Sequence, residues 1–242
     1  MMHSVTIVIP TLNEAHTVPS LLEDLREQTH LPEEIILIDS GSKDGTAEVV
    51  RKQFPEVRVL LHDKEPAHKR NMGGYLAKSE IIIFLDADTR LKSKFIEKVI
   101  REFSRRKLDV ACPWYVPHKS TLVIHGIYGL FNSMFYLLQK ILASGAGSCV
   151  VVRSSVFQNS RGYDTALKFD DIEFIRRMSW RYSFGILHTT VGVSDRRFKK
   201  HGALRMGIMY MVLSIFFTVG AFRAANIVSY EFGTYGNKRR TA

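Results

Sequence analysis

Two aspartates, Asp86 and Asp88, stand one residue apart directly after the apolar run 81–85. A run of this kind is typical of a buried strand, and two carboxylates at its end can bind a hard divalent cation such as Mg²⁺ or Mn²⁺. The cation would in turn neutralise a diphosphate. Pairs of aspartates also occur in solvated loops, so the position after a strand is what favours the functional interpretation.

Asp39 has an equivalent position, because it is the first residue beyond the apolar run 35–38. We expect Asp39 to accept hydrogen bonds from a nucleobase or ribose. The residues that follow it have turn chemistry, and Ser42, Asp44 and Gly45 are interpreted as a turn that leads into the next helix.

The first hundred residues alternate short β-branched runs with helical spacing of apolar residues. This alternation predicts strands over 5–9, 35–38, 57–61 and 81–85, and helices over 13–28, 46–54 and 67–78. Alternation with short connections predicts a parallel sheet covered by helices, with ligands bound beyond the carboxyl ends of the strands. Those ends carry Thr11, Asn13, Glu14, Asp39, Asp86 and Asp88.

The composition indicates an anionic partner. The chain has 242 residues, and its 34 Lys and Arg against 24 Asp and Glu give a net charge of +10. Phosphorylated small molecules, an anionic membrane surface and nucleic acid all suit such a charge. No nucleic-acid module or interleaving of aromatic and basic residues is present, so we expect no nucleic-acid partner. Cys112 and Cys149 lack the pattern of a disulfide framework or zinc site and are predicted to be buried thiols in a reducing compartment.

Several motifs together resemble family 2 glycosyltransferases, enzymes of the GT-A fold that use nucleotide-diphospho-sugars. The resemblance covers about residues 4–200. Its motifs are Ile9-Pro10-Thr11-Leu12-Asn13-Glu14, Asp39 to Thr46, Lys69-Arg70-Asn71-Met72-Gly73, Leu85-Asp86-Ala87-Asp88, Gly147 to Arg153, Gly162-Tyr163-Asp164 and Phe169-Asp170-Asp171. It implies a Rossmann-like mixed, mostly parallel sheet flanked by helices, to which this chain adds C-terminal apolar, membrane-associating helices.

The resemblance also implies site residues. A donor linked to UDP or GDP would contact Pro10, Thr11, Glu14, Asp39, Lys69, Arg70, Asp86, Ala87, Arg196 and Arg197, and Asp88 and Asp86 would hold Mg²⁺ or Mn²⁺. For Lys69 and Arg70 the alternative is a solvated helix face. His201 is a candidate third metal ligand or, alternatively, a solvated histidine.

Asp171 is the expected catalytic base, with Asp170 beside it at the acceptor. The family pattern usually has Glu-Asp at this point, so the shorter Asp170 leaves its acceptor contact open. Ser40, where many members have Asp, leaves the base preference open. The resemblance implies inversion by a single in-line displacement, in which a hydroxyl acceptor needs a base. A phosphate acceptor is already ionised and has less need of one.

Two apolar segments point to a membrane. Residues 120–139 and 206–222 contain no Asp, Glu, Lys or Arg, and basic residues crowd the start of the second, between 196 and 205. Residues 206–222 are compatible with a buried helix, a helix that lies on the membrane surface or a helix that spans the membrane. We divide the chain into a glycosyltransferase domain, 1–202, with 120–142 as a membrane-contacting insertion or a core helix, and an apolar helix with a basic tail, 203–242.

These observations predict a peripheral or monotopic enzyme at the cytoplasmic face of the cell membrane, since no secretory signal opens the chain. The acceptor would be a polyprenyl phosphate or a lipid-linked glycan. The alternatives are a soluble family 2 glycosyltransferase that acts on a small metabolite, and a non-catalytic module that binds nucleotide-sugars or membranes.

Overall fold

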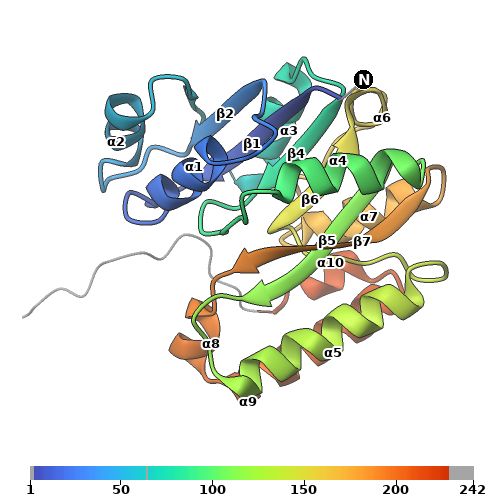
Figure 1. Cartoon of the computed structure of the whole chain (residues 1–242). Helices are drawn as coiled ribbons and strands as arrows, with labels where there is room; N and C mark the ends of the chain where they lie inside the picture. The colour runs from blue at the N-terminus through green and yellow to red at the C-terminus, as the bar shows by residue number, and fades with distance from the viewer. Residues whose placement is uncertain (1–2, 64, 229–242) are drawn as a thin grey trace, which may run out of the picture.

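A seven-stranded sheet in the order β3-β2-β1-β4-β6-β5-β7 forms the centre of the computed structural model, which describes residues 3–63 and 65–228 (Figure 1). β6 runs antiparallel to both neighbours, whereas every other pair is parallel. The predicted mixed, mostly parallel sheet is therefore confirmed. The strands are β1 (Val5–Thr11), β2 (Glu34–Asp39), β3 (Arg58–Leu61), β4 (Ile81–Leu85), β5 (Val110–Pro117), β6 (Cys149–Arg153) and β7 (Phe184–Val193).

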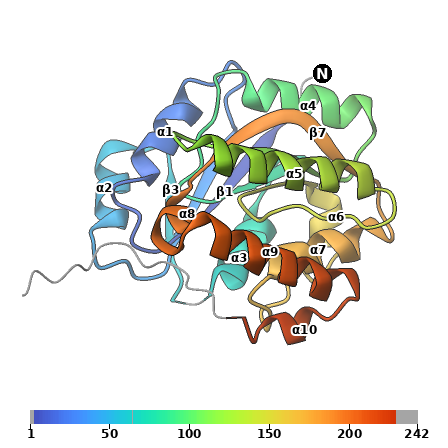
Figure 2. The same cartoon turned by 90° about the horizontal axis from the view of Figure 1, so that it is seen from below.

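Helices cover the sheet and extend below it (Figures 1 and 2). All predicted strands and helices of the first hundred residues are present, but the helix expected from Asn13 begins later, at Val18. Asn13 has φ of 55°, which interrupts a helix and leaves the segment before α1 as a turn. The helices are α1 (Val18–Arg26), α2 (Thr46–Gln53), α3 (Pro66–Leu76), α4 (Phe95–Arg105), α5 (Leu122–Leu138), α6 (Ser154–Gln158), α7 (Asp170–Ser179), α8 (Arg196–His201), α9 (Ala203–Thr218) and α10 (Phe222–Ala225).

The strand order places a topological switch point between β1 and β4. β1 pairs in parallel with β2 on one side and with β4 on the other, so chain connections leave the sheet in opposite directions there. Ligands of open α/β sheets bind in the crevice outside the carboxyl ends of such strands. Here the crevice brings Thr11 to Glu14 beside Asp86 to Asp88.

α5 and α9 lie side by side below the sheet (Figure 2), with the rings of Phe131 and Tyr210 6.0 Å apart. α5 is fixed to β5 by Asn132, whose side chain accepts from Tyr115 N at 3.0 Å and donates to Tyr115 O at 2.7 Å. Its other side is exposed, with Leu122 90% and Leu137 76% accessible. α5 is thus neither a fully buried core helix nor a detached one.

The apolar run 206–222 does not form one helix. α9 ends in a Schellman motif, in which Gly220 has φ of 73° and Ala221 N donates to Phe216 O at 2.8 Å. Among residues 3–63 and 65–228, no helix is both long and apolar enough to cross a membrane. The basic tail of the predicted segment 203–242 falls largely on residues 229–242, outside the described residues, and the domain division itself stays a prediction. Cys112 and Cys149 are buried, as predicted.

Candidate active site

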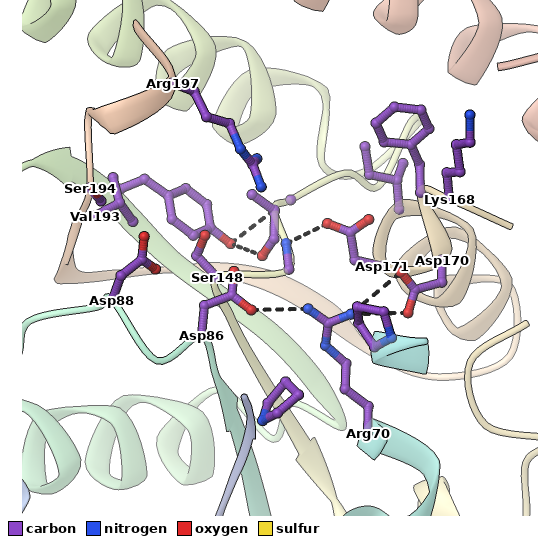
Figure 3. A pocket seen from close by; sticks show the side chains of 18 of the residues that line it. Arg70, Asp86, Asp88, Ser148, Lys168, Asp170, Asp171, Val193, Ser194 and Arg197 are labelled. Carbon is purple, nitrogen blue, oxygen red and sulfur yellow. Dashed lines mark hydrogen bonds and ion pairs between the residues drawn. The ribbon is translucent and has the colours of Figure 1, made fainter. Parts of the chain in front are cut away.

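A cavity of about 1190 Å³ opens at the carboxyl ends of β1 and β4. One wall carries Pro10, Thr11, Ala87 and the acidic residues that follow β4 and begin α7. The other wall is apolar and is formed by α5 and α9. Figure 3 shows Asp86, Asp88, Asp170 and Asp171 arranged around this space. The carboxylates expected from two separate segments therefore meet at one site.

Arg70 connects two of these carboxylates. Its guanidinium donates to Asp86 Oδ1 at 3.0 Å and to Asp170 Oδ2 at 3.1 Å (Figure 3). Burial disfavours the charged form of Arg70, but the carboxylates of Asp170 and Asp86 stabilise that form more strongly. The pKa of Arg70 is therefore raised. Burial raises the pKa of Asp170 to about 7, against the opposing charge of Arg70.

Lys69 and Arg70 do not lie on a solvated helix face, since they are only 3% and 7% exposed. Lys69 donates to Thr11 O at 2.8 Å, and burial lowers its pKa to about 8. Both cations thus hold the strand ends and α7 together from inside the cavity wall. Contact of either with a donor phosphate stays a prediction.

Asp88 and Glu14 share Arg196 from α8. The Arg196 guanidinium donates to Asp88 and lies 3.7 Å from Glu14 Oε2. Burial and the nearby charge of Asp86 raise the pKa of Asp88, while Arg196 opposes the shift. Burial also raises the pKa of Glu14 to about 8, although Thr17 donates to its carboxylate.

Asp39 is more enclosed than the sequence suggested. It is 1% exposed, and its carboxylate accepts from the Thr11 hydroxyl at 3.0 Å and from Ser42 N at 2.8 Å. It does not line the cavity, although its neighbours Ser40 and Gly41 do. In this structure Asp39 fixes the loop after β2, and its nucleoside contact stays a prediction.

Asp171 is the partly exposed member of the acidic pair on α7, whereas Asp170 is buried. Its Oδ2 accepts from the backbone N–H of Gly147, a contact visible in Figure 3. A Cβ on Gly147 would lie 2.8 Å from that oxygen, so only glycine allows this approach. Burial raises the pKa of Asp171, with Arg70 opposing the shift. A carboxylate held in this way is suited to accept a proton.

The remaining predicted residues are on α8. Arg197 extends from α8 toward the cavity (Figure 3), and His201 is the last residue of the helix. Within the described part of the chain, no group of three or more His, Cys, Asp and Glu side chains is arranged to hold a metal ion. The structure therefore does not join His201 to Asp86 and Asp88, and its role as a ligand stays a prediction.

Two features of the site were not predicted. Gly147 was recognised only as part of a motif, without its contact to Asp171. Arg176 lines the cavity and is 7% exposed, but its sequence context resembles any basic position in an amphipathic helix.

Residues 6–161 match the sequence profile of the family described as Glycosyl transferase family 2. The chain therefore belongs to this family, as the motifs suggested, and has its GT-A fold. Among curated relatives, it is 29% identical over 175 residues to the O-antigen chain rhamnosyltransferase RfbN of Salmonella typhimurium, covering 66% of this chain and 55% of that protein. It is 33% identical over 109 residues to an undecaprenyl-phosphate 4-deoxy-4-formamido-L-arabinose transferase of Pseudomonas fluorescens, covering 41% and 32% of the two chains.

Solved structures show the same fold. The mannosyltransferase PcManGT from Pyrobaculum calidifontis, in complex with GDP-Man and Mn²⁺, aligns with a TM-score of 0.66 at 19% identity, covering 80% of this chain and 57% of that one. TarS 1–349 of S. aureus aligns with a TM-score of 0.65 at 18% identity, covering 79% and 60%. The chain spans only about a third to just over half of the length of the curated relatives described, so their complete activities do not transfer directly.

Proposed function

We propose that this chain transfers a sugar, with inversion, from a UDP- or GDP-linked sugar to a lipid-linked acceptor at a membrane surface. The observation that carries the proposal is that the Asp86–Asp88 pair at the end of β4 and the separately held Asp171 face one cavity. Family membership supports the proposal, as do the similar solved structures in complex with the nucleotide-sugars GDP-Man and UDP-GlcNAc.

The acidic pair fits a divalent cation by its chemistry. Carboxylate oxygens are hard ligands, and the Asp88 carboxylate faces the cavity wall with an arginine as its ion-pair partner. Asp88 and Asp86 would hold Mg²⁺ or Mn²⁺, with His201 as a candidate additional ligand. The bound cation would supply charge neutralisation to the departing diphosphate.

Asp171 would act as the base in a single displacement. The acceptor oxygen forms a bond to the anomeric carbon while its proton passes to Asp171. The bond between that carbon and the diphosphate oxygen breaks, and the nucleoside diphosphate leaves with the electron pair. The Gly147 N–H fixes the carboxylate, and the raised pKa of Asp171 makes it a stronger base than an exposed aspartate.

Arg196 and Arg197 would bind the donor diphosphate from α8, because guanidinium groups suit phosphate oxygens. Arg196 contacts Asp88 and Glu14 in the structure, so donor binding would require this side chain to exchange carboxylate for phosphate partners. The nucleoside would be surrounded by Pro10, Thr11, Glu14, Asp39 and Ala87. Lys69 and Arg70 would hold the neighbouring backbone and carboxylates in place.

A lower surface formed by α5 and α9 supports membrane docking. Its exposed side chains are mainly apolar: Leu122, Val123, Leu130, Leu137, Leu204, Ile208, Met211 and Ile215. Exposed cations surround it at Lys140, Lys199, Lys200, Arg205 and Arg223. An apolar surface flanked by positive charge favours binding to an anionic membrane leaflet. We therefore propose that the protein acts at the cytoplasmic face. The acceptor would then be a polyprenyl phosphate or lipid-linked glycan.

The test of catalysis is a screen of UDP- and GDP-sugars for transfer or hydrolysis with Mg²⁺ or Mn²⁺. We expect Asp171→Asn to lower kcat by about 100- to 10,000-fold while nucleotide binding is retained. Asp88→Ala should lose activity and metal-dependent nucleotide binding, and exposed Glu48→Gln is the control. Turnover of a hydroxyl acceptor by Asp171→Asn at the normal rate would refute the assigned base. Nucleotide-sugar binding without turnover under every condition would instead support a non-catalytic module.

The membrane part has its own test. We expect flotation with vesicles of phosphatidylcholine and phosphatidylglycerol at low salt, and weaker flotation of Ile208→Glu. Failure to bind these vesicles would favour a small soluble acceptor.

A further inference from the structure

Arg176 is a buried positive charge without a carboxylate partner. It is 7% exposed, and no Asp or Glu oxygen of the described residues forms an ion pair with it. Its guanidinium instead donates to Ala143 O at 2.8 Å, Phe217 O at 3.1 Å and Ser144 Oγ at 3.1 Å. Burial lowers its pKa, and no neighbouring acid compensates. An uncompensated buried charge is costly, so its place in a cavity wall indicates an anionic ligand.

The cavity around Arg176 is apolar on its far side. α5 contributes Phe131, Met134, Phe135 and Leu138, and α9 contributes Tyr210, Leu213 and Phe217. The same cavity continues to Asp171 and Asp86. One ligand can therefore contact a hydrocarbon wall, a guanidinium and the proposed base at once.

From this juxtaposition we infer that Arg176 binds the phosphate of a lipid-linked acceptor whose single hydrocarbon chain lies between α5 and α9. The inference rests on the proposed function and specifies its acceptor. An amphiphile needs a cation for its anionic head group and an apolar surface for its hydrocarbon chain, and this cavity provides both.

The position of Arg176 also distinguishes between the two acceptor chemistries. Asp171 contacts Gly147, whereas Arg176 contacts Ala143 and Ser144 at the other end of the same segment. The two side chains therefore occupy different parts of the cavity wall. A phosphate held by Arg176 is then not held at the base. The reacting group is then a hydroxyl of a sugar attached to the lipid phosphate, and not the phosphate itself.

Binding of farnesyl diphosphate and of farnesol provides the test, because the two probes share a chain and differ in charge. The measurement is made with Mn²⁺ and saturating UDP, or GDP, so that the donor site is filled. We expect the wild type to prefer farnesyl diphosphate by about 10- to 100-fold, the range for hydrogen bonds to a charged group. Arg176→Gln should abolish this preference and Arg176→Lys should retain part of it. Exposed Arg181→Gln is the matched control.

The chain site is tested by Ser214→Phe, which would fill the apolar part of the cavity, against Ser133→Phe on the exposed side of α5. Ser214→Phe should weaken both probes at least tenfold, while Ser133→Phe should bind as the wild type does.

Arg176 also ties the last turn of α9 to α7, and a purely structural role would weaken both probes equally. An unchanged ratio in Arg176→Gln therefore overturns the inference, as does equal binding by Ser214→Phe and Ser133→Phe. Efficient glycosylation of farnesyl phosphate at its phosphate would overturn the sugar-hydroxyl assignment. If Arg176→Gln does not fold, Arg176→Lys and the serine pair still decide the question. Donor hydrolysis by the wild type tests the proposed function separately, because it needs no lipid.

Discussion

Replacing Glu14 by glutamine should stabilise the protein, and increasingly so as the pH rises. The Glu14 side chain is 11% exposed, and burial raises its pKa from 4.5 to about 8. Between these values the folded state binds a proton that the unfolded state has released. Stability contributed by this proton is therefore lost as pH rises from the unfolded pKa through the folded one. Glutamine keeps the shape of the protonated side chain and has no charge to bury.

The size of the effect follows from the pKa difference. Each pKa unit corresponds to about 1.4 kcal/mol, so ionisable Glu14 costs under about 1 kcal/mol at pH 5 and about 3 kcal/mol at pH 7. At pH 8 the cost is about 4 kcal/mol, an upper value because water can enter the cavity. Urea unfolding at these pH values measures the free energy of unfolding of both proteins. The exposed Glu48→Gln controls for the loss of one negative charge.

A stability difference between Glu14→Gln and wild type that does not grow from pH 5 to pH 8 would refute the reasoning. It would mean that Glu14 is ionised in the folded state and stabilised by Arg196, 3.7 Å away. In that case Glu14→Gln would be the less stable protein at pH 8.

Three further variants test the site. Arg70→Met should lower the free energy of unfolding by about 3–5 kcal/mol at pH 7, measured in urea, because it leaves buried Asp170 without its cation. Gly147→Ala should reduce turnover without weakening nucleotide binding, since its Cβ would lie 2.8 Å from Asp171 Oδ2; unchanged kcat would contradict the base assignment. Asn132→Leu removes two hydrogen bonds to the backbone of β5 and should destabilise by about 2–3 kcal/mol, measured by urea unfolding.

The sheet edge that holds the acidic pair was predictable because local signals agree there. The strand 81–85 is β-branched and aromatic, lies next to β1 as the alternating pattern requires, and ends directly at Asp86. The meeting of Asp86 with Asp171 was implied by the family resemblance, not by the spacing of the residues. Nothing local in the sequence encodes this contact, because the α7 carboxylates follow β4 by more than eighty residues.

The burial of Lys69 and Arg70 could not be predicted for a related reason. Helix α3 has no marked apolar stripe, so its sequence does not say which side faces the sheet. Arg70 becomes an interior residue because Asp170, a hundred positions later, provides a carboxylate at 3.1 Å. A single sequence shows two such charges but not that they neutralise each other.

The two apolar segments were ambiguous for a physical reason that the structure makes explicit. A helix with one buried side shows a stripe of apolar residues, whereas α5 and α9 are apolar on nearly all sides. Each helix has three environments: the protein interior at Ile124 or Met206, the cavity at Phe131 or Tyr210, and the exposed lower surface. If a hydrocarbon chain fills the second and a leaflet the third, every side of both helices is selected to be apolar. The proposed acceptor and the membrane then explain why neither helix shows the single apolar stripe of a helix with one buried side.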